Sequence, residues 1–123
     1  MQYICLIYAP ADLKMTDDEG EALFQAYGAF TAQARGSGKM IAGEPLQPTS
    51  DATTVRVRNG KRSITDGPFA ETKEWLGGFY IFDCDTLDEA IDWAANIPGA
   101  KYGSIEIRPI MPIPGMAHGR PVA

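Results

Sequence analysis

The chain has few of the residues on which most catalytic motifs depend. Among its 123 residues there is one histidine, His118, and there are two cysteines, Cys5 and Cys84, which stand far apart. The sequence therefore excludes a histidine-rich metal site, and it contains neither a glycine-rich phosphate loop nor a nucleophile elbow. We expect no cofactor and no metal. Each cysteine stands in or beside an apolar segment, which favours two buried free thiols over a disulfide.

Long apolar runs and an excess of basic residues are also missing. No segment approaches the roughly 20 apolar residues that a membrane helix needs, and the N-terminus has the pattern of a strand rather than that of a signal peptide. A net charge of −5 disfavours binding to nucleic acid and to anionic membranes, which are themselves negative. We therefore expect a cytoplasmic protein with neither kind of partner.

The sequence does contain enough apolar residues for a core, at 45% of the chain. Its length suits one compact domain and is too short for two ordinary ones. We expect a single domain over residues 1–110. Pro112 and Pro114 then belong to an extended tail over residues 111–123.

Two capping boxes predict two helices. The first, over residues 16–19, begins a helix expected over residues 17–37, and the second, over residues 86–89, begins a helix that ends at Pro98. In each helix, apolar residues recur at helical spacing and predict one buried stripe. The stripes are Leu23, Phe24, Tyr27, Phe30 and Ala34 in the first helix, and Leu87, Ala90, Ile91 and Ala94 in the second, with Trp93 at its margin.

The remaining apolar segments are short and predict six strands. They are residues 3–8, 39–43, 53–58, 61–66, 77–83 and 103–108. Asn59-Gly60 favours a two-residue type I′ hairpin turn, which sets Val55 opposite Ile64. With Val57, these two residues share a face of the hairpin that we expect to be buried. The glycine pair at 77–78 predicts a bulge.

The order of these elements defines a fold. Without the hairpin it is β-α-β-β-α-β, the ferredoxin-like arrangement. We therefore predict an α+β fold with an inserted β-hairpin and with both helices on one face of an antiparallel sheet. Strands 3–8 and 79–82 carry apolar residues on both sides, so the face without helices needs a cover. A two-fold homodimer that packs sheet against sheet is the simplest cover.

Residues 66–74, Asp-Gly-Pro-Phe-Ala-Glu-Thr-Lys-Glu, are the most specific segment of the chain. They resemble the signature of the DGPF proteins, a branch of the YCII-related family. Further matching segments are residues 26–30, 42–44, 46–48, 53–58, 93–95 and 103–109. The resemblance implies a ferredoxin-like α+β fold and a dimeric α/β-barrel type of assembly.

The same resemblance bears on partners and on chemistry. Genes of this type often lie beside, or are fused to, genes for extracytoplasmic-function sigma factors, so a sigma factor is a partner that the resemblance suggests. Some YCII-related proteins carry a histidine and an aspartate proposed as an acid/base pair. The only histidine here, His118, lies in the predicted tail, so the histidine half of that pair cannot be transferred.

Asp66 begins the signature and has two interpretations. An aspartate before Gly-Pro can hydrogen-bond its own backbone and shape a turn, which accounts for the Asp-Gly-Pro sequence. Alternatively, Asp66 is a carboxylate at a strand end that faces a cavity and acts as a general base or anchors a ligand.

Glu71, Lys73 and Glu74 add three charges to the signature. If residues 70–75 are extended, Glu71 and Lys73 point to one side and Glu74 to the other. A solvated charged edge is the ordinary explanation. The alternative is one polar wall of a ligand site, in which Glu71 is a second candidate base and Lys73 binds an anion.

Arg108 and Tyr27 complete the candidate ligand-binding set. Arg108 shares a strand face with Glu106, which predicts either an ion pair or a bidentate contact from Arg108 to a carboxylate or phosphate. Tyr27 belongs to the apolar stripe of the first helix and is more often a core residue. Its hydroxyl nevertheless needs a partner, which a pocket would provide.

Three functional hypotheses follow. The first is a homodimer that binds a small polar or anionic molecule beside the signature, with any catalysis being cofactor-free acid/base chemistry. The second is a non-enzymatic accessory or regulatory module that contacts another protein, such as a sigma factor. The third is a structural dimer whose signature only builds the fold.

Overall fold

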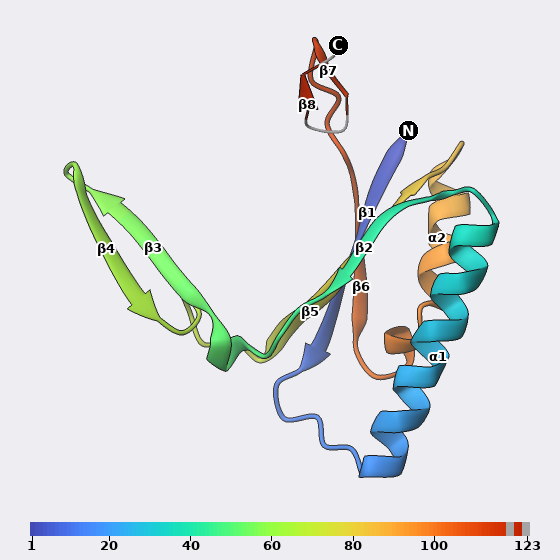
Figure 1. The fold of residues 1–123 in the computed structure, drawn as a ribbon, viewed down its shortest axis with the longest axis horizontal. Helices are drawn as coiled ribbons and strands as arrows, with labels where there is room; N and C mark the ends of the chain where they lie inside the picture. Colours follow the sequence, from blue (N-terminus) through green and yellow to red (C-terminus); the bar gives the residue numbers. More distant parts are fainter. Residues whose placement is uncertain (118–119, 122–123) are drawn as a thin grey trace.

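The computed structural model describes residues 1–117 and 120–121, with side chains up to residue 115. Its main body is one antiparallel sheet of four strands in the order β2-β5-β1-β6. Both α-helices cover the same face of this sheet (Figure 1). The elements are β1 Gln2–Pro10, α1 Asp17–Gly36, β2 Met40–Pro45, η1 Thr49–Asp51, β3 Thr53–Arg58, β4 Lys61–Asp66, β5 Glu74–Asp83, α2 Leu87–Asn96, η2 Pro98–Lys101, β6 Ser104–Pro109, β7 Met116–Ala117 and β8 Arg120–Pro121.

This strand order confirms the predicted ferredoxin-like α+β fold with an inserted hairpin. The bulge predicted at the glycine pair is present, because Ile7 pairs with Gly78 and Tyr8 with Leu76, which leaves Gly77 without a partner in the ladder. Neither helix of the described chain combines the length and the hydropathy that a membrane span requires. His118 lies outside the described residues.

The capping box that begins α1 is complete. The backbone N–H of Glu19 donates to Thr16 Oγ1 at 3.1 Å, and the backbone N–H of Thr16 donates to Glu19 Oε1 at 3.0 Å. These bonds satisfy two of the backbone donors that a helix start leaves unpaired. In the predicted stripe, Phe30 and Ala34 are buried, but Phe24 is 76% exposed and does not belong to the core.

The buried face of α2 differs from the predicted one. Leu87 and Ile91 are 50% and 45% exposed, whereas Ala90 and Ala94 are buried. Trp93 packs inward and stacks on Phe82, with ring centroids 5.3 Å apart. The helix is rotated so that its indole joins the core, because a tryptophan removes more apolar area from water than a leucine or an isoleucine.

The core is centred on an aromatic cluster between the helices and the sheet. Phe30 of α1 contacts the rings of Tyr80, Phe82 and Trp93 at centroid distances of 5.2–6.4 Å. Cys5 and Cys84 lie buried beside the cluster as free thiols, which confirms the prediction. Burial, with a smaller contribution from Cys84, raises the pKa of the Cys5 thiol to about 11, so this group is protonated and unreactive near neutral pH.

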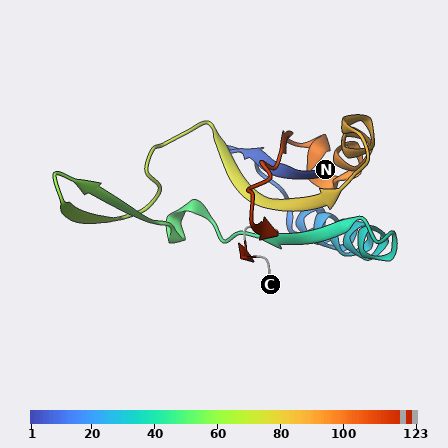
Figure 2. The ribbon, with the colours of Figure 1, turned by 90° about the horizontal axis from the view of Figure 1, so that it is seen from above.

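The β3–β4 hairpin forms a separate two-stranded sheet that projects from the body as an arm (Figure 2). Val55 pairs with Ile64 as predicted, and the positive φ angles of Asn59 and Gly60, 53° and 73°, give the expected type I′ turn. The prediction that the apolar face is buried is wrong within one chain. Val55, Val57 and Ile64 are 57%, 60% and 58% exposed, because the arm reaches beyond the body.

We expect Gly103→Ala to lower the free energy of unfolding by about 2–3 kcal/mol, because forced packing costs this much. A Cβ at position 103 would overlap the backbone carbonyl of Tyr8, which cannot move aside as a flexible side chain could. Gly20→Ala is the matched control. A Cβ at position 20 in α1 meets nothing within 4 Å, so this change should raise stability by about 0.5–1 kcal/mol. Equal effects in urea unfolding of the two variants would contradict the packing argument.

Candidate functional site

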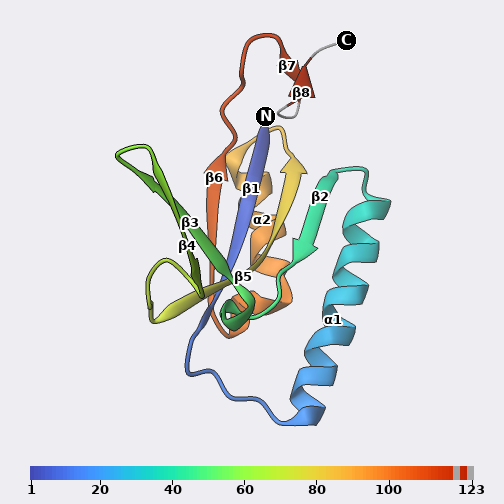
Figure 3. The ribbon, with the colours of Figure 1, turned by 60° about the vertical axis from the view of Figure 1, so that its left-hand side comes forward.

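A cavity of about 670 Å³ lies between α1 and the sheet. On the helix side, it is lined by residues from successive turns of α1. On the sheet side, it is lined by the C-terminal ends of β1 and β2 and by the middle of β5, and η2 closes one part of it. The N-terminal end of α1 extends beyond the sheet (Figure 3), so this half of the helix has no strand packed against it. The volume falls within the range of small-molecule sites.

Glycines create much of this space. Gly28, Gly43, Gly77, Gly78 and Gly99 all line the cavity, so that several of its wall positions carry no side chain. At three of them a side chain could not be added without displacing a neighbour. A Cβ at Gly99 would overlap the Tyr27 hydroxyl. A Cβ at Gly78 would lie 2.9 Å from the carbonyl oxygen of Glu44, and a Cβ at Gly43 would lie 2.6 Å from the Tyr80 ring. At Gly28, by contrast, there is open space.

Two hydroxyl groups on α1 anchor the polar part of the cavity wall. The backbone N–H of Gly99 donates to the Tyr27 hydroxyl at 3.1 Å. One helical turn later, Thr31 Oγ1 and the Tyr80 hydroxyl lie 2.7 Å apart and share a hydrogen bond. These contacts hold both tyrosines in place against a wall that is otherwise mostly apolar.

The Tyr27 hydroxyl is a proton donor at neutral pH. Burial raises the pKa of Tyr27 above its ordinary value, the hydrogen bond from Gly99 acts in the opposite direction, and nearby Tyr80 adds to the rise. Because Tyr27 accepts from Gly99, its own proton is directed elsewhere, and no described residue accepts it. The cavity therefore offers one hydrogen-bond donor to an oxygen of a bound molecule.

Charged residues line the cavity as well. Arg35, a further turn along α1, and Glu44 of β2 both contribute to its wall, and both also line an adjoining hollow of about 280 Å³. The described side chains form two ion pairs, Met1 with Asp83 and Lys39 with Glu89, and neither includes Arg35 or Glu44. One cation and one anion are therefore available to a polar substituent of a ligand.

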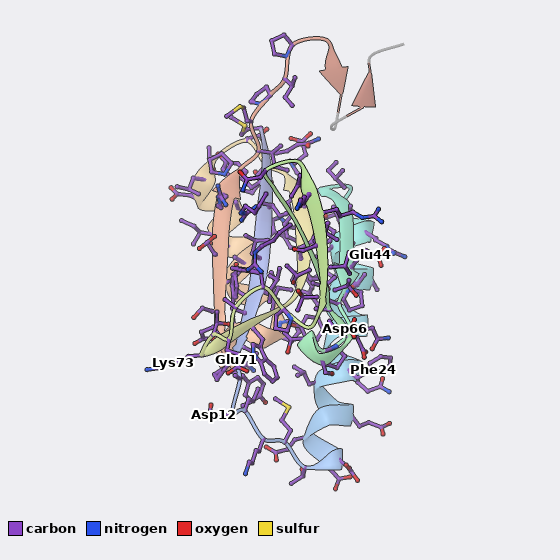
Figure 4. The ribbon with its side chains drawn as sticks, turned by 90° about the vertical axis from the view of Figure 1, so that its left-hand side faces the viewer. Asp12, Phe24, Glu44, Asp66, Glu71 and Lys73 are labelled. Carbon is purple, nitrogen blue, oxygen red and sulfur yellow. The ribbon has the colours of Figure 1, made fainter. Side chains whose placement is uncertain are left out.

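Of the six residues predicted for the site, Tyr27 lines this cavity and the other five do not. Asp66, Glu71, Lys73, Glu74 and Arg108 are all exposed. Figure 4 shows Asp66 apart from Glu71 and Lys73, so one chain does not bring these groups to a common point. The expected ion pair between Glu106 and Arg108 is not formed either. The functional roles assigned to the five exposed residues stay predictions.

The turn within the signature is built mainly by its backbone. Gly67 has a φ of +100°, and its N–H donates to the carbonyl of Ala52 at 2.7 Å. Its carbonyl accepts from Thr54 Oγ1 at 2.8 Å, and the carbonyl of Phe69 accepts from Arg56 at 3.2 Å. The Asp66 carboxylate takes no part in these bonds. The signature therefore holds the base of the arm to β3, and no described residue pairs with the Asp66 carboxylate.

Sequence reasoning missed Thr31, Arg35 and Glu44. A signal for the first two was present, since Tyr27, Thr31 and Arg35 recur every four residues and so form a polar row beside the apolar stripe of α1. Glu44 gave no comparable signal, because its position depends on how the β2 edge meets α1.

Comparison with known proteins identifies a family and a similar fold. The family model of the YCII-related domain matches residues 1–114. An uncharacterised protein of Rhizobium meliloti is 41% identical over 95 residues, which are 76% of this chain and 77% of that protein. The structure of 5-chloro-2-hydroxyhydroquinone dehydrochlorinase from Burkholderia phenoliruptrix, in complex with 2,5-dihydroxybenzoquinone, is similar with a TM-score of 0.53 at 15% identity, covering 90% of this chain and 94% of that one. At this identity the likeness concerns the fold.

We expect Tyr27→Phe to lower the free energy of unfolding by about 1 kcal/mol, because the Gly99 N–H loses its acceptor. The variant should also lack the tyrosine that titrates above the ordinary pKa in an absorbance titration. Tyr102→Phe is the matched control: its ring is 42% exposed, so the change in stability should stay within about 0.5 kcal/mol. Equal losses in the two variants would show that the Tyr27 hydroxyl is not anchored as described.

Proposed function

The chain belongs to the YCII-related family, and we propose that it binds a small molecule in the cavity beside α1. The observation that carries this proposal is the cavity itself: about 670 Å³, walled by glycines, and equipped with few polar groups at fixed positions. Mostly apolar walls with a small number of placed donors are typical of small-molecule sites.

The lining defines the kind of ligand. An apolar ring or short chain fits the part of the wall made by Ile7, Leu23 and Phe24. An oxygen on the ligand would accept the proton of Tyr27, and an acidic substituent would pair with Arg35. The ligand that we propose is thus less polar than the small polar or anionic molecule expected from the sequence. An anionic group on it is still compatible with Arg35.

The homodimer is the second part of the proposal. Cross-strand pairing puts Ile4 opposite Ile81 and Leu6 opposite Phe79, and their neighbours along the strands are buried against the helices. These four residues therefore form an apolar strip on the face that the helices leave uncovered (Figure 1). A second copy related by a two-fold axis would cover the strip.

The charged residues of the signature could take part in this function only if a second copy brings them to the cavity. Arg108 pairs opposite Ile4 on the uncovered face, and Asp66 lies at the base of the arm. Cofactor-free acid/base chemistry, with Asp66 or Glu71 as base and Lys73 or Arg108 as anion clamp, requires that a second copy bring these groups to the cavity. The compartment that we propose is the cytoplasm, where both thiols stay reduced.

An accessory role, including contact with a sigma factor, has one observation in its favour, which is the exposed arm. The two functions differ in what they require of the cavity. An accessory module needs no ligand, and so it predicts no effect of cavity substitutions on binding of small molecules.

A pair of leucine variants on α1 tests the cavity. Gly28 lines it and has open space around its missing side chain, whereas Gly20 has equal space but lies outside the lining. We expect monocyclic phenols and hydroxyquinones, including 2,5-dihydroxybenzoquinone, to raise the melting temperature of the wild-type protein. Gly28→Leu should weaken this binding by at least about tenfold, because its side chain occupies the site. Gly20→Leu should leave it unchanged.

Two results would count against small-molecule binding in this cavity. One is that no compound of the panel stabilises the wild-type protein in thermal-shift or calorimetric titration. The other is that Gly28→Leu and Gly20→Leu bind the same compound equally well, which would place the binding site elsewhere.

A further inference from the structure

The chain exposes far more surface than a compact protein of its size. Its accessible surface is 9022 Å², whereas a folded monomer of 13.3 kDa is expected to expose roughly 6,500 Å². The surplus is about 2,500 Å² per chain. Stable obligate dimers bury about 2,000–5,000 Å² in total, so two copies that covered each other's surplus would reach the upper part of that range.

The arm, residues 53–66, carries three of the sixteen large apolar side chains that are exposed in the described chain. Alternation along its strands gives it two unlike faces. Val55, Val57 and Ile64 lie on one face together with Arg62, which pairs opposite Val57. Phe69 of the adjoining signature is 74% exposed. The opposite face carries Arg56, Arg58, Ser63 and Lys61.

An isolated hairpin with this composition is not expected to be stably ordered by itself. Two-stranded hairpins are at best marginally stable in water, and they become stable when an apolar face packs on something else. The arm pairs with no strand of the four-stranded sheet within the described chain. A single chain therefore leaves Val55, Val57 and Ile64 more than half exposed.

Charge favours a second copy as that cover. The arm holds four of the eleven basic residues and one of the sixteen acidic residues, so its net charge is +3 and that of the rest of the chain is −8. Acidic residues begin both helices of the body: Asp17, Asp18 and Glu19 in α1, and Asp88 and Glu89 in α2. A basic arm and an acidic body of the same sequence attract each other between two copies.

We propose that the arm of each protomer packs its apolar face, formed by Val55, Val57 and Ile64, against a second copy of the chain. This inference rests on the homodimer of the proposed function and adds the arm to the sheet-to-sheet contact. The two-fold symmetry covers both arms at once, because each protomer gives and receives the same contact.

The arrangement gives the signature a place in the assembly. Asp66 lies on the same face of the hairpin as Ile64, two residues along β4, and Gly67 and Phe69 are tied to β3 at the base of the arm. The segment over residues 66–69 therefore lies at the edge of the arm contact. It presents the unpaired Asp66 carboxylate to the partner.

The test compares two lysine substitutions at neighbouring positions on opposite faces of β4. Ile64→Lys places a charge on the apolar face, and Ser63→Lys places the same charge on the basic face; both side chains are exposed in one chain, so neither change removes packing within it. We expect sedimentation velocity to show a wild-type dimer. Ile64→Lys should raise the dimer dissociation constant by at least about tenfold, since a buried unpaired charge costs that much or more. Ser63→Lys should not.

Val57→Lys is a second variant on the apolar face and should act as Ile64→Lys does. If either variant unfolds on dilution and refolds at higher concentration, this result also supports the arm contact. It would show that the substituted residue, which is exposed in one chain, stabilises the fold through the partner. A wild-type monomer would overturn the homodimer and the arm contact together. A dimer that survives both substitutions, or that Ser63→Lys weakens equally, would overturn the arm contact alone. Ligand binding by the Gly28 and Gly20 variants reports separately on the cavity.

Discussion

Uncovered apolar β-surface is the constraint on which the rest of this structure depends. The two helices cover one face of the sheet and bury the aromatic cluster around Phe30 and Phe82. Within the described residues no third layer covers the other face, and the hairpin projects away from the body. The large exposed area and the separation of basic arm from acidic body are two consequences of this single arrangement. The second copy that we propose would cover the exposed surface and would bring a basic arm against an acidic body.

The cavity lies on the helix-covered side of the sheet, and its origin is different. It exists because glycines replace side chains at several wall positions and because α1 extends beyond the strands. Three of its polar side chains, Tyr27, Thr31 and Arg35, come from one row of α1, with Tyr27 anchored to Gly99 and Thr31 to Tyr80. In the function that we propose, the helix-covered face supplies the binding site and the uncovered face supplies the dimer contact. The signature connects the arm to the body between them.

Sequence alone predicted the features that depend on local geometry. The capping box at Thr16, the type I′ turn at Asn59 and the bulge beside Gly77 are each set by a few adjacent residues, and each is present. Burial was harder to predict, because it depends on what lies opposite. Ile64 alternates like a buried residue but is 58% exposed within its own chain. In α2, Trp93 takes the place that the pattern assigned to Leu87 and Ile91, because the Phe82 ring faces it. The cavity could not be predicted, since it is space that missing side chains leave between distant elements.

Hydrogen exchange of the arm amides, measured over a dilution series, tests the central claim most directly. The ladder between β3 and β4 is protected only while something orders the hairpin. If a second copy does so, the amides of residues 53–66 exchange slowly at high protein concentration, and their protection falls as the dimer dissociates, while the amides of β1 and β5 stay protected for longer. Fast exchange of the arm at every concentration, or protection that does not change on dilution, would contradict the account.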